Sequence, residues 1–134
     1  MLRRHVTDRA VIDASAAVDV LQRNARSRRV EQALADYDLI APAHIDVEVL
    51  SALHRHVRAG TDTMLEMTSR LALWQSWPIT RVALPTLLRG AASLVNSVRI
   101  PDTFYIELAE QYAVPLITCD RGMAAATNRA ILVT

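Results

Sequence analysis

The sequence contains a single cysteine, Cys119, and only three glycines among its 134 residues. One cysteine cannot form an intramolecular disulfide, and it cannot supply the ligands of a cysteine-based zinc site. Three glycines can hardly build a glycine-rich phosphate-binding loop, and no Gly-x-Ser-x-Gly motif is present. These absences exclude a disulfide scaffold and argue against nucleotide-binding and serine-hydrolase functions.

Long apolar runs are also absent. No uncharged stretch approaches the roughly 20 residues of a membrane span, and residues 1–12 carry basic side chains without the apolar stretch of a signal peptide. We therefore expect a soluble, unprocessed protein of the reducing cytoplasm. With 51% hydrophobic residues, the chain can fill a two-sided core, and its length predicts one domain over residues 1–134.

Lysine is missing, so all 15 positive side chains are arginine, and the net charge is only +1. Arginine suits bidentate contacts with phosphate, but a GC-rich codon bias gives the same preference without a functional reason. The densest basic cluster consists of Arg23, Arg26, Arg28 and Arg29. These arginines could contact RNA phosphates, or they could lie in a solvated linker between two helices.

Apolar periodicity predicts strands that alternate with helices along the whole chain. Strands are expected at residues 10–13, 39–42, 79–84, 115–118 and 130–134. Helices are expected at residues 15–23, 27–37, 44–60, 62–77, 85–96 and 102–112, with a short helical turn after Asp120. Strands joined by helices of this length form parallel crossovers, which predicts an α/β fold with three layers, α/β/α, around a central parallel sheet of four or five strands.

Four acidic residues are expected at one rim of this sheet. Asp13 and Asp120 directly follow apolar strands, whereas Glu48 and Asp102 lie at helix starts. Each one alone could be a helix cap or a partner of a helix dipole, as could Asp46 beside Glu48. Ligands of parallel sheets bind at the carboxyl ends of the strands, however, and the carboxylates would converge there if the strands before Asp13 and Asp120 are neighbours.

The negative charge of such a cluster must be compensated by bound cations, because each like-charge pair at about 5 Å costs roughly 3 kcal/mol at an effective dielectric of about 20. The repulsion predicts a raised pKa for at least one of the acids in the absence of metal. Oxygen-only ligands select hard cations, Mg²⁺ or Mn²⁺, which activate water and neutralise charge on phosphates. The cluster therefore predicts metal-assisted hydrolysis of a phosphodiester.

Three segments, "VIDASAAVDVL", "APAHIDVEVLSALHR" and "RIPDTFYIELAEQYAVPLITCDRGMA", resemble in their order and separation the PIN-domain ribonucleases, specifically the VapC-type toxins of VapBC toxin–antitoxin systems. The resemblance covers nearly the whole chain. It implies a homodimeric endoribonuclease that depends on Mg²⁺ or Mn²⁺, cleaves structured RNA such as tRNA or rRNA, and is blocked by a cognate VapB-type antitoxin. The family's acidic quartet, catalytic and metal-binding, corresponds to Asp13, Glu48, Asp102 and Asp120.

Two hydroxyl residues could support this quartet. Ser15 matches the hydroxyl residue that such toxins carry after the first aspartate, and it could orient Asp13 or cap the first helix. Thr118 could act in the same way, or it could be an ordinary β-branched strand residue. Neither is expected to be catalytic itself.

The chain also departs from the family pattern. Asp102 follows Pro101 and precedes Thr103 and Phe104, which could shift the helix start and change where Asp102 points. The extra acid that some PIN nucleases carry just after Asp120 is missing, so the sequence leaves open whether one or two metal ions bind.

Other residues with chemical potential have simpler interpretations. His54 and His56 point away from each other on a helix and are expected in solvent or at an interface. Cys119 is expected in the core, and Trp74 and Trp77 in the core or a dimer contact. The alternative to a nuclease is a catalytically weak PIN-like protein that acts mainly as a binding partner of an antitoxin, but a pure binding module has little reason to keep four repelling carboxylates.

Overall fold

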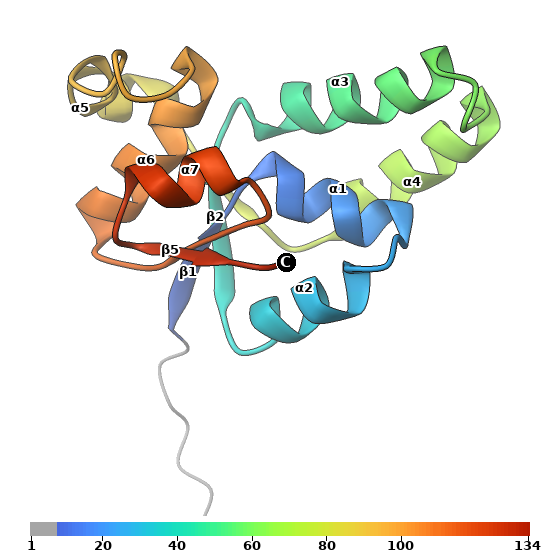
Figure 1. The fold of residues 1–134 in the computed structure, drawn as a ribbon, viewed down its shortest axis with the longest axis horizontal. Helices are drawn as coiled ribbons and strands as arrows, with labels where there is room; N and C mark the ends of the chain where they lie inside the picture. The colour runs from blue at the N-terminus through green and yellow to red at the C-terminus, as the bar shows by residue number, and fades with distance from the viewer. Residues whose placement is uncertain (1–7) are drawn as a thin grey trace, which may run out of the picture.

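The computed structural model describes residues 8–134, which form a five-stranded sheet around which the helices pack (Figure 1). The strands are β1 (Arg9–Ile12), β2 (Asp38–Pro42), β3 (Thr80–Val82), β4 (Leu116–Thr118) and β5 (Ala130–Leu132). Their order is β3-β2-β1-β4-β5, and every neighbouring pair is parallel. The predicted parallel sheet is confirmed, with five strands.

Helices cover both faces of this sheet. They are α1 (Ala14–Gln22), α2 (Ser27–Leu34), α3 (Ile45–Arg58), α4 (Met64–Ser76), α5 (Leu88–Ala92), α6 (Ile100–Tyr112) and α7 (Arg121–Ala126), and a short 3-10 helix, η1 (Leu84–Leu87), precedes α5. Figure 1 shows α6 to the left of β1 and β2, and α1, α2 and α4 to their right. Helix α6 packs against β1, β2 and β4, while α1 packs against α2, α3, α4 and β4. The predicted three layers are confirmed.

The two central strands are buried on both faces, which explains why they read as continuous apolar runs. Val11 and Ile12 of β1 and Leu116 and Ile117 of β4 are fully buried. Val11 pairs with Leu116, and Ile12 pairs with Ile117. This register brings the carboxyl ends of β1 and β4 side by side.

The chain leaves β1 and β4 in opposite directions. Strand β1 is followed by α1 and α2 and then by β2 on one side, whereas β4 is followed by α7 and then by β5 on the other. The strand order therefore reverses between β1 and β4, and such switch points are where parallel sheets form ligand-binding crevices.

Two predicted helices differ from the observed ones. Helix α6 begins at Ile100 rather than at Asp102, because Pro101 fits the first turn, where no backbone donor is needed. The helix expected over residues 85–96 is shorter, with η1 followed by only five residues of α5. At its end the backbone bonds tighten, since the N–H groups of Ser93 and Leu94 bond to carbonyls three residues back, Gly90 at 3.1 Å and Ala91 at 3.0 Å.

The helix predicted most clearly from the sequence, α3, runs from Ile45 to Arg58 and ends just before Gly60. Gly60 has a φ of 80°, which explains why glycine terminates this helix. Within residues 8–134, none of the helices combines the length and the apolar character that a bilayer span requires.

Candidate active site

Asp13 lies directly after β1 and is almost completely buried, with 2% of its surface exposed. Its side chain caps α1, since Oδ1 accepts a 3.0 Å hydrogen bond from the Ala16 backbone N–H. Ser15 Oγ donates to the same oxygen at 2.7 Å, and Thr118 Oγ1 donates to Oδ2. Three donors therefore compensate this buried carboxylate and fix its orientation.

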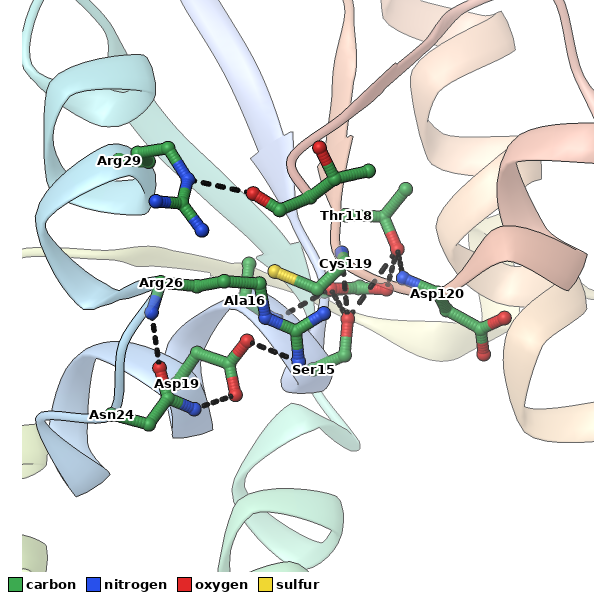
Figure 2. Close-up of polar contacts among 11 residues, drawn as sticks. Ser15, Ala16, Asp19, Asn24, Arg26, Arg29, Thr118, Cys119 and Asp120 are labelled. Carbon is green, nitrogen blue, oxygen red and sulfur yellow. Dashed lines mark hydrogen bonds and ion pairs between the residues drawn. The ribbon is translucent and has the colours of Figure 1, made fainter.

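Ser15 and Thr118 also join the ends of the two central strands. Each hydroxyl donates its hydrogen to Asp13 and accepts a backbone N–H from the end of β4, Cys119 N at 3.0 Å and Asp120 N at 2.9 Å respectively. Figure 2 shows both hydroxyls between these two segments. The expected contact of Ser15 with Asp13 is present, whereas its alternative role as helix cap is wrong, because Asp13 is the cap.

Burial raises the pKa of Asp13 from its ordinary value of 3.8 to about 6. The hydrogen bonds from Thr118, Ala16 and Ser15 oppose this rise, because they stabilise the ionised form. Repulsion from Asp120 contributes in the same direction as burial, but less than any of these effects. The predicted rise is present, and its main cause is desolvation rather than the mutual repulsion on which the prediction was based.

Asp120 is exposed and caps α7. Its Oδ1 accepts the backbone N–H groups of Gly122 at 2.7 Å and of Met123 at 3.2 Å. The capping interpretation of Asp120 is therefore correct, but it does not exclude a second role, because the residue also lines the crevice beside Asp13.

Glu48 lies in the first turn of α3, and its side chain is about one-fifth exposed. Tyr105, from α6, donates its hydroxyl to Glu48 Oε1 at 2.6 Å. Burial and this contact with Glu48 raise the pKa of Tyr105 well above its usual range, so the phenol remains a donor. Nothing in the local sequence pattern indicated this contact, because the two residues are 57 positions apart.

Asp102 lies in the first turn of α6, with 13% of its side chain exposed. The Arg99 guanidinium is 3.5 Å from Asp102 Oδ2, and it is mostly exposed. Asp102, and more weakly Glu48 and Asp120, raise the pKa of Arg99. Arg99 therefore provides a basic partner for this part of the acidic cluster. Pro101 leaves Asp102 directed at the same crevice as the other acids.

All four predicted acids line a single crevice of about 490 Å³ at the carboxyl ends of β1 and β4. Their oxygen donors suit Mg²⁺ or Mn²⁺, which prefer carboxylates and water. Within residues 8–134, however, no three histidine, cysteine or acidic side chains are grouped closely enough to hold a metal ion as they stand. The crevice thus has the chemistry of a metal site without a preassembled set of ligands.

The family model of the PIN domain matches residues 10–128 of this chain. Ribonuclease VapC3 from Mycobacterium tuberculosis is 42% identical over 120 residues, which span 89% of this chain and 88% of the relative. The chain belongs to the PIN domain family, among its VapC-type members. Ribonuclease VapC12 from the same organism is 34% identical over 114 residues, covering 85% of this chain and 88% of that protein. The resemblance predicted from the sequence is confirmed.

Solved structures give the same fold for this PIN domain. A toxin–antitoxin complex from Klebsiella pneumoniae has a TM-score of 0.65 at 16% identity, covering 91% of this chain and 95% of that chain. VapC20 from Mycobacterium tuberculosis, described as a sarcin-ricin loop cleaving toxin, has a TM-score of 0.66 at 14% identity, covering 87% and 94%. At these identities the likeness concerns the fold alone.

None of the four arginines of the basic cluster, for which RNA contact and a solvated linker were the alternatives, lines the crevice of this PIN domain. Arg26 pairs with Asp19 at 2.9 Å, and Arg29 Nε donates to the Thr134 backbone oxygen at 2.6 Å (Figure 2). Arg23 and Arg28 line a different and larger hollow, of about 930 Å³, between α2 and α4. Their contact with RNA stays a prediction.

Two other arginines, missed in the sequence, line the acidic crevice, namely Arg55 and Arg99. Arg55 could have been found, because it lies seven residues after Glu48 and therefore on the same face of α3. Arg99 could not have been found from the sequence, since it lies in the irregular segment before α6, where no periodicity indicates which way a side chain points.

Asp46 has a structural role at the other side of α3. Its Oδ1 accepts hydrogen bonds from Trp74 Nε1 and from Arg81 Nη2, both at 2.7 Å, and its Oδ2 accepts one from Arg81 Nε at 3.2 Å. These donors lower the pKa of Asp46, with the Arg81 hydrogen bond as the largest cause. Trp74 is buried and packs edge-on against Trp77, with 5.7 Å between ring centroids, so the core interpretation of Trp74 is confirmed.

The remaining candidates agree with their simpler interpretations. Cys119 is buried, and burial raises the pKa of its thiol to about 12. His54 and His56 are both exposed on α3, as expected. His56 nevertheless lines the outer part of the crevice.

Proposed function

We propose that this chain is a Mg²⁺- or Mn²⁺-dependent endoribonuclease toxin of a type II toxin–antitoxin system. The observation that carries the proposal is the meeting of four carboxylates, from β1, α3, α6 and β4, in one crevice at the switch point of the sheet. These side chains are Asp13, Glu48, Asp102 and Asp120. The ribonuclease names of the VapC relatives support the same activity.

The four acids would hold the metal through their carboxylate oxygens. Asp13 is fixed by three donors, so it would serve as the rigid anchor of the site. Glu48, Asp102 and Asp120 line the same crevice and would supply further carboxylate oxygens, and the mostly exposed Arg99 beside Asp102 would be available to the substrate phosphates. A bound divalent cation would supply activation of water and neutralisation of phosphate charge.

Structured RNA, such as tRNA or rRNA, is the proposed substrate. One solved neighbour is described as a toxin that cleaves the sarcin-ricin loop, which supports an RNA of this kind. The proposed partner is a VapB-type antitoxin, supported by the toxin–antitoxin complex among the structural neighbours. We further propose that the chain acts in the cytoplasm as a homodimer.

The test compares the purified, antitoxin-free wild type with Asp13→Asn on total RNA. Each protein is incubated with Mg²⁺, with Mn²⁺ and with EDTA, and the new RNA ends are sequenced. Discrete cuts that need metal and are absent from Asp13→Asn are expected. They would also name the target RNA and the cleaved position.

The alternative function, a catalytically weak partner of an antitoxin, is favoured by one observation, the absence of a preassembled metal-binding group among residues 8–134. If folded wild-type protein cuts no RNA under any metal condition and still binds its antitoxin, the alternative replaces the nuclease.

A further inference from the structure

The side chain of Glu48 is held at one of its two oxygens. Tyr105, of which only 1% is exposed, donates its hydroxyl to Oε1 at 2.6 Å. His44 Nε2 lies 3.6 Å from the same oxygen. No hydrogen bond reaches Oε2 from residues 8–134. Both contacts therefore act on the same half of the carboxylate.

His44 also connects the start of α3 to the start of α6. Its Nε2 lies 2.9 Å from the backbone carbonyl of Pro101, and a carbonyl can only accept, so Nε2 carries the hydrogen in this tautomer. The ring packs at 5.2 Å from Phe104 and at 5.0 Å from Tyr105, measured between ring centroids. The positions of Glu48 and of the first turn of α6, which carries Asp102, are thus linked through one side chain.

We propose that Tyr105 is a positioning residue for Glu48, which holds Oε1 so that Oε2 is left free for a divalent cation in the acidic crevice. His44 supports this arrangement by linking the start of α3 to the Pro101 carbonyl. Only Tyr105 is within hydrogen-bond distance of Glu48, since His44 Nε2 lies 3.6 Å from Oε1 and donates its hydrogen to Pro101. Neither touches the cation or the substrate. The inference rests on the proposed metal site and adds the residues that set its affinity.

The physical reason is the cost of ordering a flexible ligand. A glutamate side chain loses rotamer freedom when it binds a metal, and a buried hydrogen bond from a rigid donor removes part of that cost beforehand. Tyr105 is suitable because its ring is buried in the hydrophobic core, with 1% of its surface exposed. Loss of its hydroxyl alone leaves the packing in place and frees Glu48.

The experiment measures the dissociation constant for Mn²⁺ by the EPR signal of the free ion, with no RNA present. Tyr105→Phe is expected to bind Mn²⁺ about 10- to 100-fold more weakly than wild type, the range found for outer contacts of metal ligands. Tyr112→Phe is the matched control, since it removes a hydroxyl from the same helix at a partly exposed position, and it should change the constant by less than about twofold.

A second comparison uses the Glu48→Gln background, in which Tyr105→Phe should cause no further loss. A merely structural role of Tyr105 would lower the melting temperature and leave the Mn²⁺ constant unchanged. If Tyr105→Phe does not fold, His44→Phe carries the test: it keeps an aromatic ring beside Tyr105 but removes the link from α3 to the Pro101 carbonyl that sets Glu48 against Tyr105, and it should weaken Mn²⁺ binding.

The outcomes separate the two proposals. If wild type binds Mn²⁺ and Glu48→Gln binds it weakly, while Tyr105→Phe binds as tightly as wild type, the positioning role is overturned and the metal site stands. If wild type binds no Mn²⁺, the proposed metal site fails, and this inference fails with it.

Discussion

Asp13 shows how a carboxylate can be buried at the end of a strand. Three donors surround it, and two of them are hydroxyls that also accept backbone N–H groups from the neighbouring strand end. Without these bonds, burial of the charge would cost several kcal/mol. Burial still dominates, because the pKa of Asp13 remains raised to about 6.

The raised pKa predicts a specific dependence of stability on pH. Between about pH 4 and pH 6 the folded state binds more protons at Asp13 than the unfolded state, so the free energy of unfolding falls as the pH rises through this window. In EDTA, the stability of Asp13→Asn relative to wild type should therefore rise by about 2 kcal/mol between pH 4 and pH 7, because the variant has no buried carboxylate to ionise. Urea unfolding across this range measures it.

The control for that experiment is Asp36→Asn, at an exposed position outside the crevice. It should give a parallel pH profile to the wild type. An Asp13→Asn profile that is also parallel to wild type would contradict the raised pKa.

Thr118→Val tests the hydroxyl that contacts Asp13 from β4. The substitution keeps the shape of a fully buried side chain but removes one donor to the carboxylate and one acceptor for the Asp120 N–H. It should lower the free energy of unfolding by about 1–3 kcal/mol at pH 7.5, and by less at pH 4, because Thr118 holds the pKa of Asp13 down. Thr68→Val, at an exposed position of α4, should have little effect at either pH.

At the level of single residues, the sequence was most informative where a side chain follows a strand. The positions of Asp13 and Asp120 followed from the apolar runs before them, and the family resemblance pointed to Ser15. The bond between Tyr105 and Glu48 and the approach of Arg99 to Asp102 could not be predicted, because they depend on how α3, α6 and the preceding loop pack in space.

At the scale of elements, the sequence predicted each strand of the sheet and most of the helices, because apolar periodicity reports directly which face is buried. It failed at the end of α5, where the backbone bonds switch to carbonyls three residues back, and at the start of α6, where Pro101 lies in the first turn. Proline was taken to precede the helix, although its fixed φ and missing N–H suit the first turn. Such boundaries depend on single bonds and not on a repeating pattern.

Helix α4 provides a test that is separate from the crevice. Thr63 caps it, accepting the Glu66 N–H at 3.1 Å, while the Glu66 side chain accepts the Thr63 N–H at 2.8 Å. Thr63→Ala should lower the free energy of unfolding by about 1 kcal/mol and leave RNA cleavage and Mn²⁺ binding unchanged. Ser76→Ala, at the other end of α4, should cost less, and equal losses in chemical denaturation would contradict the cap.

At the scale of the whole molecule, the site depends on the strand order. The adjacency of β1 and β4, far apart in the sequence, brings Asp13 and Asp120 together, and α3 and α6 add Glu48 and Asp102 to the same crevice. The sequence predicted this convergence only on the condition that these strands are neighbours. The distribution of basic side chains was predicted less well. The arginines that cluster in the sequence do not line the crevice, whereas Arg55 and Arg99 line it together with the four acids.

This distribution predicts which arginine matters for RNA affinity. In the Asp13→Asn background, where cleavage is not expected, Arg55→Gln should weaken RNA binding and reduce the slope of log affinity against log salt by about 0.7–0.9, the value of one phosphate contact. Fluorescence anisotropy at several salt concentrations measures both. Arg129→Gln, whose arginine pairs with Glu110 at 2.9 Å, should change neither the affinity nor the slope.

The double variant Arg23→Gln with Arg28→Gln tests the basic cluster predicted from the sequence. If affinity and salt dependence are unchanged, these two arginines have no role in RNA binding. If Arg55→Gln leaves RNA affinity and its salt dependence unchanged while the double variant weakens binding, RNA approaches from the α2 side rather than across the crevice.

The most direct test of the central claim is a crystal structure of the protein with Mn²⁺, using the anomalous signal of the ion. We expect an anomalous peak in the crevice at the carboxyl ends of β1 and β4, about 2.1 Å from oxygens of Asp13 and at least one more of the four acids. The same crystal form of Asp13→Asn should lose the peak. A wild-type crystal with no peak in the crevice at saturating Mn²⁺ would contradict the metal site and the nuclease mechanism built on it.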